Sequence, residues 1–301
     1  MSTTKVTTIS DLQKPVAQLQ RILVATDFSD GSRSALNCAL GIAERFQSKI
    51  FLVHVIPVLP YVSPGSSEEA LQQARKFASR EMRQLLEAAD YSGMAHLEIL
   101  SGGRVWPLLQ EYVKRQSIDL VVVGTRGHSL GNNQLLGPVA EEIFRLAECP
   151  ILTVGAQSQR SAPAADGLQR ILYATNFKPH SERAGFIAHS LEREHGAKLT
   201  VLHVVEEQLQ SREGSQGIVR DFMLRRLRKG LPAGCVGKCE PEFQVRFGDP
   251  GEQILSVARE QQSNLIILGL RSGMPAEGQL PSAIAYKIVC QAPCPVLTTR
   301  L

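Results

Sequence analysis

The sequence predicts an α/β protein built from two doubly wound, five-stranded parallel-sheet domains in tandem. Three observations lead to this fold class. The chain has 301 residues, about twice the length of a typical domain. Its first half is repeated in the second, and within each copy short apolar runs alternate with helix-like segments. Near-continuous apolar strands separated by helices are typical of a parallel sheet that is buried on both faces.

The internal repeat sets the domain boundaries. The segment RILVATDF at 21–28 returns as RILYATNF at 170–177, and LVHV at 52–55 returns as VLHV at 201–204. Near the end of each copy, CPILT at 149–153 matches CPVLT at 294–298. Between the copies, GAQSQRSAPAADGL has the small, polar composition of a linker. We therefore expect an N-terminal tail at 1–20, a domain at 21–154, a linker at 155–169 and a second domain at 170–301.

The first half of copy one reads as strand, helix, strand, helix. RILVA at 21–25 is a short apolar run, and Ser29 or Asp30 can cap a helix in which alanines recur every fourth residue. The β-branched run IFLVHVI at 50–56 has strand length. The charged segment 68–90 predicts a long helix with one apolar stripe, formed by Leu71, Ala74, Ala78, Leu85 and Ala89.

The remainder of copy one continues the alternation and ends on an apolar strand. The segments are a strand HLEIL at 96–100, a helix after Trp106-Pro107, a strand LVVVG at 120–124, a helix over 138–147 and a strand PILTV at 150–154. The final strands of the two copies, PILTV and PVLTT, are apolar, and an exposed strand of that kind invites pairing. We therefore expect the copies to pack as a pseudo-dimer within one chain.

Composition and charge limit the class of protein. With 43% apolar and 21% charged residues the chain is globular, and no apolar run approaches the length of a membrane span. The first twenty residues lack the apolar core of a signal peptide, so we expect a cytoplasmic protein that does not bind membranes. The formal charge of +4 gathers in part at Arg220 to Lys229, which we interpret as a solvated helix face, with no nucleic-acid partner. The six cysteines are expected to be reduced, with no metal site.

Candidate chemistry lies in the loops that leave the strands 21–25 and 120–124. In open parallel sheets, ligands bind outside the carboxyl ends of the strands, where the strand order reverses. Thr26 and Asp27 follow the first of these strands, and the second leads into a loop with Gly124, Gly127 and Gly137. Glycines permit close approach of backbone to a ligand, and the helix that follows Gly137 offers N–H groups to an anion such as phosphate.

These segments resemble the universal stress protein family. The residues that carry the resemblance are ATDFS, LVHV, the G-x(2)-G-x(9)-G loop and the ending VAEEI with CPILTV, and the whole chain resembles the tandem two-domain form over about 21–154 and 170–299. The resemblance implies a strand order of 3-2-1-4-5, pairing of domains through their fifth strands, and homodimers in the family. It also implies ATP or a related adenine nucleotide, with magnesium, as the ligand of some members.

Carried over residue by residue, the resemblance implies a nucleotide site in domain 1 alone. Its cofactor-binding residues would be Thr26, Asp27, Val55, Gly124, Arg126, Gly127, Gly137 and Val139. Position 138 departs from the family pattern, because binders usually place Ser or Thr where Pro138 offers neither a hydroxyl nor an N–H. This loss is expected to weaken ATP binding, although proline is also favoured in the first turn of a helix.

The second copy departs further. Asn176 replaces Asp27, Ser272 replaces Gly127 and Ser282 replaces Gly137, so we interpret domain 2 as a structural partner that does not bind nucleotide. The leading interpretation is a non-catalytic stress-response protein. The alternatives are an ATP-dependent switch that regulates a protein partner and a slow ATPase. An ATPase would need a general base, for which Asp27, His128, Glu141 and Glu142 are the candidates, whereas His54 and His203 are expected to be core histidines.

Overall fold

The computed structural model of the chain alternates strands and helices through both repeats. It describes residues 19–57, 67–127, 136–155, 158, 168–206, 215–230, 240–271 and 282–300. The elements of the first half are β1 (Arg21–Thr26), α1 (Asp30–Phe46), β2 (Lys49–Ile56), α2 (Ser67–Ala88), β3 (Ala95–Ser101), α3 (Val105–Arg115), β4 (Leu120–Gly124), α4 (Pro138–Leu146) and β5 (Ile151–Val154). Those of the second half are β6 (Arg170–Ala174), α5 (Pro179–His195), β7 (Lys198–Val205), α6 (Ser215–Gly230), β8 (Glu242–Phe247), α7 (Pro250–Glu260), β9 (Leu265–Leu270), α8 (Ala283–Gln291) and β10 (Val296–Arg300).

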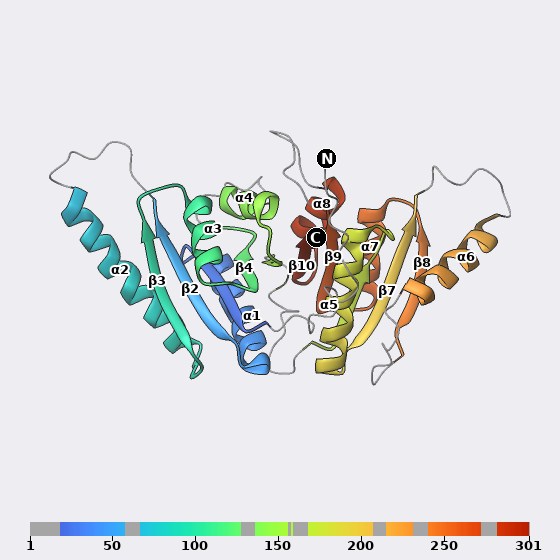
Figure 1. Ribbon diagram of the computed structural model, residues 1–301, viewed down its shortest axis with the longest axis horizontal. Coiled ribbons are helices and arrows are strands. Elements are labelled where there is room, and N and C mark those ends of the chain that lie inside the picture. Colours follow the sequence, from blue (N-terminus) through green and yellow to red (C-terminus); the bar gives the residue numbers. More distant parts are fainter. Residues whose placement is uncertain are drawn as a thin grey trace, which may run out of the picture.

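All of these strands join in one ten-stranded sheet, in the order β3-β2-β1-β4-β5-β10-β9-β6-β7-β8 (Figure 1). Each half therefore has the order 3-2-1-4-5 with parallel pairing, which confirms the predicted fold class. The reversal of strand order falls between β1 and β4 in the first half and between β6 and β9 in the second. These two points are where a parallel sheet opens a crevice for a ligand.

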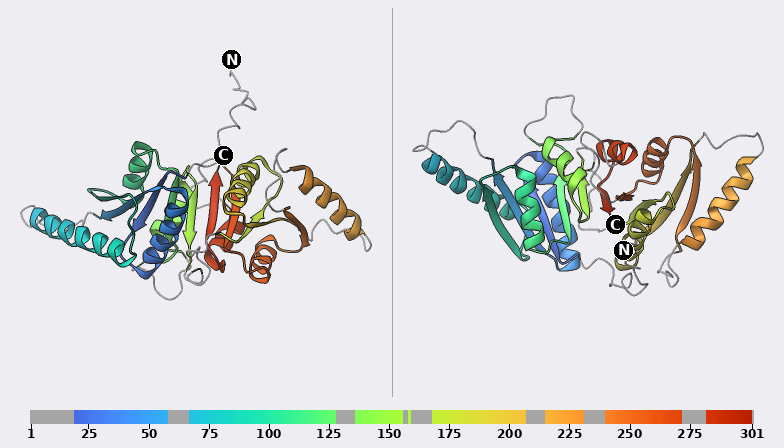
Figure 2. Two further views of the ribbon diagram at one scale, coloured as in Figure 1. Left: turned by 90° about the horizontal axis from the view of Figure 1, so that it is seen from below. Right: turned by 45° about the horizontal axis from the view of Figure 1, so that its top comes forward.

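Helices cover both faces of the sheet, because side chains alternate in direction along each strand. Ile22 and Val24 of β1 pack with α1 in one apolar cluster, whereas Leu23 packs with α3 and α4 in another. The same division holds in the second half, where α5 and α6 lie on the first face and α7 and α8 on the other. Figure 2 shows α2 and α6 at the two far ends of the molecule.

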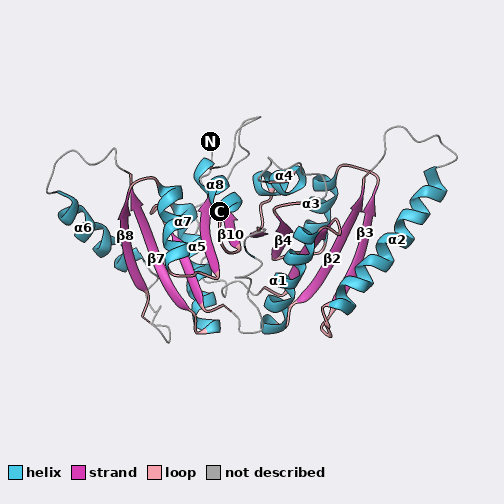
Figure 3. Ribbon diagram, turned by 180° about the vertical axis from the view of Figure 1, so that it is seen from behind, coloured by secondary structure: helices cyan, strands magenta, loops and turns pink. Residues whose placement is uncertain are grey.

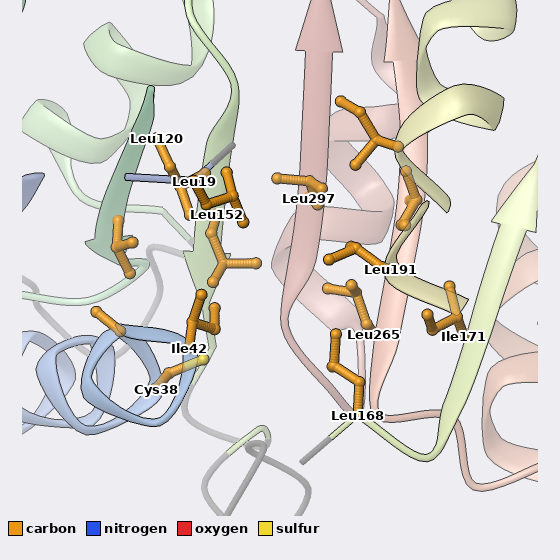
Figure 4. Close-up of a cluster of buried hydrophobic side chains, with 14 of the residues drawn as sticks. Leu19, Cys38, Ile42, Leu120, Leu152, Leu168, Ile171, Leu191, Leu265 and Leu297 are labelled. Carbon is orange, nitrogen blue, oxygen red and sulfur yellow. The ribbon is translucent and has the colours of Figure 1, made fainter. Parts of the chain in front are cut away.

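The two halves meet at the centre of the sheet. Strand β10 pairs antiparallel with β5, with Leu297 opposite Leu152, and Figure 3 shows matching elements on either side of this pair. The predicted pairing through the fifth strands is thus confirmed. On the face of the sheet that α1 and α5 cover, leucines from both halves pack at the junction with Cys38 and Ile42 of α1 (Figure 4). Because this edge is occupied inside the chain, a second copy cannot add to the sheet there.

Polar groups also cross the junction. The guanidinium of Arg300 donates to the carbonyl oxygens of Phe144 and Arg145, at 2.6 and 2.9 Å, and so satisfies the last turn of α4 from the other half. On α5, His189 Nδ1 lies 3.0 Å from a carboxylate oxygen of Glu192, whose side chain is 0% exposed. At the corresponding positions of α1 the first half has Leu40 and Ala43.

The observed elements differ from the sequence predictions only in detail. Ser29, one of the two predicted caps, is the N-cap of α1, where its side chain accepts from Ser32 N. Helix α3 begins at Val105 rather than after Pro107, because proline is tolerated in a first helical turn. The described helices include none with the length and apolarity that a membrane span requires.

Candidate functional site

The carboxyl ends of β1, β2 and β4 and the start of α4 enclose a cavity of about 160 Å³, which we call the first cavity. Its floor is apolar, with Val53 and Val123 among the lining residues. Every residue that the sequence predicted for a nucleotide site lines it: Thr26, Asp27, Val55, Gly124, Arg126, Gly127, Gly137 and Val139. The fold therefore brings together residues that are up to 113 positions apart in the sequence.

The loop after β1 is held in a fixed conformation by its own polar side chains. Phe28 adopts a positive φ of 67°, which is unusual for a residue with a side chain, and its N–H donates to Thr26 Oγ1 at 3.1 Å. Asp27 accepts from the N–H of Ser29 at 3.1 Å and from the Ser29 hydroxyl. These bonds place the exposed carboxylate of Asp27 at the mouth of the cavity.

His54 on β2 also lines the first cavity, beside this loop. Its Nδ1 lies 2.8 Å from the carbonyl oxygen of Thr26, and its ring lies 4.5 Å from that of Phe28. Burial lowers the pKa of His54 below 6.5, against smaller opposing effects of the Thr26 hydrogen bond and the Asp27 charge. The neutral ring therefore donates from Nδ1 and keeps Nε2 as an acceptor.

The sequence analysis placed His54 in the core and did not consider Phe28. The structure puts the imidazole at the edge between core and cavity. Phe177 and His203 repeat the arrangement in the second half, with a φ of 59° and a ring separation of 4.4 Å. The retained Phe in ATDF and ATNF, together with the repeated histidine, was the available sequence signal.

The glycines of the loop after β4 have different physical roles. A Cβ on Gly124 would lie 2.5 Å from the carbonyl of Gly31, so this glycine allows the strand to pack against the first turn of α1. Gly127 lies against the Asp27 carboxylate, which a Cβ would meet at 2.3 Å. Gly137, the N-cap of α4, has a φ of −69°, which any residue can adopt. Packing against α1 therefore requires a glycine at position 124, and its predicted approach to a ligand stays a prediction.

The first turn of α4 presents backbone amides that have no partner within the helix, and Val139 and Ala140 line the first cavity. Pro138 occupies the first helical position, and no side chain caps the helix. The N–H groups of Val139 and Ala140 have no carbonyl one turn earlier within the helix, whereas Glu141 N bonds to Gly137 O at 2.8 Å. This end of the helix carries partial positive charge, and Pro138 removes one of its three donors.

The candidate bases for hydrolysis are less well placed. Glu142 forms an ion pair with Arg104 at 2.6 Å, and neither it nor Glu141 lines the first cavity. His128 lies outside the described residues, as do Ser272, Cys235 and Cys239. Of the candidates that the structure describes, only Asp27 reaches the cavity, and both Ser29 donors already bond to it.

The remaining predictions concern cysteines and the basic stretch. Burial raises the pKa of the Cys38 and Cys294 thiols to about 12 and those of Cys149 and Cys290 to about 11, so none is a ready thiolate. Within the described ranges, no group of three or more His, Cys, Asp or Glu side chains could hold a metal ion.

The basic stretch lies on α6 and is exposed. Three of its arginines cover aromatic rings of the second half: Arg220 lies 5.5 Å from Phe247, Arg226 4.3 Å from Phe177 and Arg228 6.0 Å from Phe243. These contacts give part of the charge excess a packing role.

Comparisons with known proteins agree with this architecture. The universal stress protein family model matches residues 18–155 and again residues 167–300. A universal stress protein of Methanocaldococcus jannaschii is 31% identical over 141 residues, which cover 45% of this chain and 81% of the relative. The universal stress protein YxiE of Bacillus subtilis is 27% identical over 144 residues, 44% of this chain and 97% of its own length.

A solved structure supports the tandem arrangement of the fold. The crystal structure of a universal stress protein from Archaeoglobus fulgidus has a TM-score of 0.70 at 20% identity, and the match covers 94% of this chain and 99% of that one. The likeness therefore extends over both halves and their mutual packing. The family model matches both halves, each half has the strand order 3-2-1-4-5, and the halves join through their fifth strands. This chain therefore belongs to the universal stress protein family, in its tandem two-domain form.

Proposed function

We propose that the first half binds an adenine nucleotide, ATP with magnesium, in the first cavity, and that the protein acts by binding rather than by catalysis. The observation that carries the proposal is the convergence on one cavity of a carboxylate, apolar strand ends and helix amides that have no partner within the helix. Each suits a different part of a nucleotide: an acceptor for sugar hydroxyls, an apolar surface for a base, and donors for phosphate.

The size of the cavity constrains the pose. About 160 Å³ is below the range of about 300–1,000 Å³ that is usual for small-molecule sites, so it encloses only part of a nucleotide. In the proposed pose the base and ribose lie inside, between Asp27 and Val55. The phosphates lie at the mouth, against Gly127 and the amides of Val139 and Ala140.

Binding without hydrolysis is supported by the positions of the candidate carboxylates. Asp27 accepts two hydrogen bonds from Ser29, and the neutral His54 commits its Nδ1 proton to Thr26 O. Glu141 and Glu142, the other candidate bases that the structure describes, do not line the first cavity. Occupancy of the cavity would then be the signal, read by a protein partner.

The test is isothermal titration of the intact chain with MgATP, with Asp27→Asn as the probe variant. The substitution is structurally safe, because Asn176 holds the same position in the second half and accepts from Lys178 N and Ser181 Oγ. Removing the carboxylate is expected to weaken MgATP binding by about tenfold, because hydrogen bonds to charged acceptors are stronger than those to neutral acceptors by about 1 kcal/mol or more.

Asn176→Asp, the reverse change in the second half, is the matched control and should leave the measured affinity unchanged. Absence of any MgATP binding by the parent protein, or equal binding by the parent and Asp27→Asn, would contradict the proposal. Release of inorganic phosphate faster than the hydrolysis of ATP without protein would instead identify a slow ATPase.

A further inference from the structure

The second half contains a larger cavity at the equivalent place, which we call the second cavity. It measures about 470 Å³ and opens at the carboxyl ends of β6, β7 and β9, beside α7 and α8. This volume falls within the range of about 300–1,000 Å³ that is typical of small-molecule sites. The substitutions Asn176, Ser272 and Ser282 predict a purely structural role for this half, so no ligand has been assigned to the second cavity.

The polar groups of the second cavity do not suit a nucleoside triphosphate. Asn176 replaces the carboxylate, and its Oδ1 already accepts from Lys178 N at 3.1 Å and Ser181 Oγ at 2.7 Å. At the start of α8, Ser282 Oγ accepts from the N–H of Ala285 at 3.2 Å. The equivalent amide of the first half, on Ala140, has no such cap. In the second half, the side chain of Ser282 therefore occupies the amide whose counterpart in the first half is proposed to bind phosphate.

Positive charge has nevertheless gathered around the second cavity. Lys178 lines it at the position that Ser29 holds in the first half, and its ammonium forms no ion pair with any residue in the described part of the chain. Burial lowers the pKa of His180, and the charges of Lys178 and Arg271 lower it further. Glu206 is the single carboxylate among the lining residues that the structure describes.

The charges beside the cavity histidine also differ between the two halves. Burial lowers the pKa of His203, and the cation of Arg226 adds to that effect. Around His54 in the first half, the charge of Asp27 acts in the opposite direction and raises the pKa. Lys178 in the lining of the second cavity, with Arg226 close to His203 and Arg271 close to His180, favours an anionic ligand.

The walls of the second cavity are mainly apolar. They are formed by aliphatic side chains of the three strands and of both adjoining helices, including Leu202, Val204, Ile254, Leu268, Ile284 and Ile288. Ile254, Leu268 and Ile288 are at most 6% exposed, so they form a preformed surface rather than a solvated rim. A ligand that fills this space needs an apolar body as well as a negative charge.

We propose that the second cavity binds an organic monocarboxylate with an apolar chain of medium length. The carboxylate pairs with the ammonium of Lys178, and the chain lies against Ile254, Leu268 and Ile288. The two halves of the protein thus offer sites of different chemistry, one for a nucleotide and one for an apolar acid. The second assignment stands on its own cavity and does not depend on nucleotide binding in the first.

The test is isothermal titration of the intact protein with sodium octanoate below its micellar concentration. One site per chain is expected. Octylamine, which has an apolar chain of the same length and the opposite charge, should not bind, and saturating MgATP should not displace octanoate. Lys178→Met keeps the aliphatic stem and is expected to weaken binding by about tenfold, since it removes a charge-assisted contact.

Two further variants complete the design. Lys114→Met removes an exposed cation on α3, far from the second cavity, and should bind octanoate like the parent. Ile284→Ser shortens the apolar wall at a residue that is 39% exposed and should weaken octanoate several-fold without loss of folding. Four outcomes would each overturn the proposal. They are equal effects of the two lysine substitutions, octylamine binding as tight as octanoate binding, no binding of octanoate, and displacement of octanoate by MgATP.

Discussion

Substitution of Pro138 gives a signed prediction for the nucleotide site. Pro138 is exposed at the first position of α4, and it lines the first cavity beside Val139 and Ala140, whose amides have no partner within the helix. The preceding Gly137 already has the extended φ and ψ of an N-cap, at −69° and 153°. A serine at 138 therefore enters the same helical turn and adds one N–H and one hydroxyl where the helix end favours an anion.

The magnitude follows from the number of donors gained. A net gain of about 2 kcal/mol from two new hydrogen bonds to charged phosphate corresponds to about thirtyfold tighter MgATP binding. Pro138→Ala restores only the N–H and should give about half of that free energy, or about fivefold. Affinity for AMP should rise less, because AMP lacks the distal phosphates. Loss of the preset φ of proline should lower the free energy of unfolding by about 0.4–1 kcal/mol.

The assay is isothermal titration of the parent and both variants with MgATP and AMP, paired with urea unfolding of each. Ala283 holds the position of Pro138 in the second half, so Ala283→Ser is the matched control and should not change MgATP affinity. If Pro138→Ser folds normally and binds MgATP no more tightly than the parent, the missing donors are not what limits the site. The anion-binding role assigned to the start of α4 would then be refuted.

Three further predictions concern stability, each measured by urea unfolding. Gly124→Ala should destabilise the protein by about 1–3 kcal/mol, because its Cβ meets backbone at 2.5 Å, whereas Gly217→Ala in open space on α6 should be neutral or stabilising. His189→Leu removes the ring that lies 3.0 Å from the buried carboxyl group of Glu192 and should lower the free energy of unfolding by about 1–3 kcal/mol. The double variant His189→Leu, Glu192→Ala should recover most of this loss. Burial lowers the pKa of His54 below 6.5, so the unfolded chain binds more protons than the folded one as the pH drops below about 6.5. The free energy of unfolding should therefore fall over this range, and His54 should contribute up to about 1.4 kcal/mol per pH unit. His54→Asn should remove this contribution.

Each stability prediction has an outcome that would contradict it. Equal effects of the two glycine substitutions would show that the strand can move away from α1. A double variant on α5 that is no more stable than the single His189→Leu variant would mean that the buried carboxyl group of Glu192 is not the source of the loss. An unchanged pH dependence in His54→Asn would assign the acid sensitivity to other groups.

The sequence determined the fold and the membership of the first cavity, because both rest on local patterns that repeat. Apolar runs of strand length fixed which segments enter the sheet, and the recurrence of RILVATDF fixed that there are two such units. The topology of a parallel sheet then brings Asp27 and Gly137 to one crevice, whatever the details of packing. For this reason the eight predicted residues line a single cavity.

Tertiary structure decided the roles that depend on what each residue touches. Only the packing shows that Gly124 serves the contact with α1, and that the neutral ring of His54 lies at the cavity edge. The same holds for the second half, where Asn176 and Ser282 look like simple losses in the sequence. In the fold, Ser282 caps α8 with its side chain, and the second cavity is larger than the first and is lined by Lys178 and by aliphatic side chains. Burial, charge environment and free volume arise from segments distant in sequence, so no local pattern encodes them.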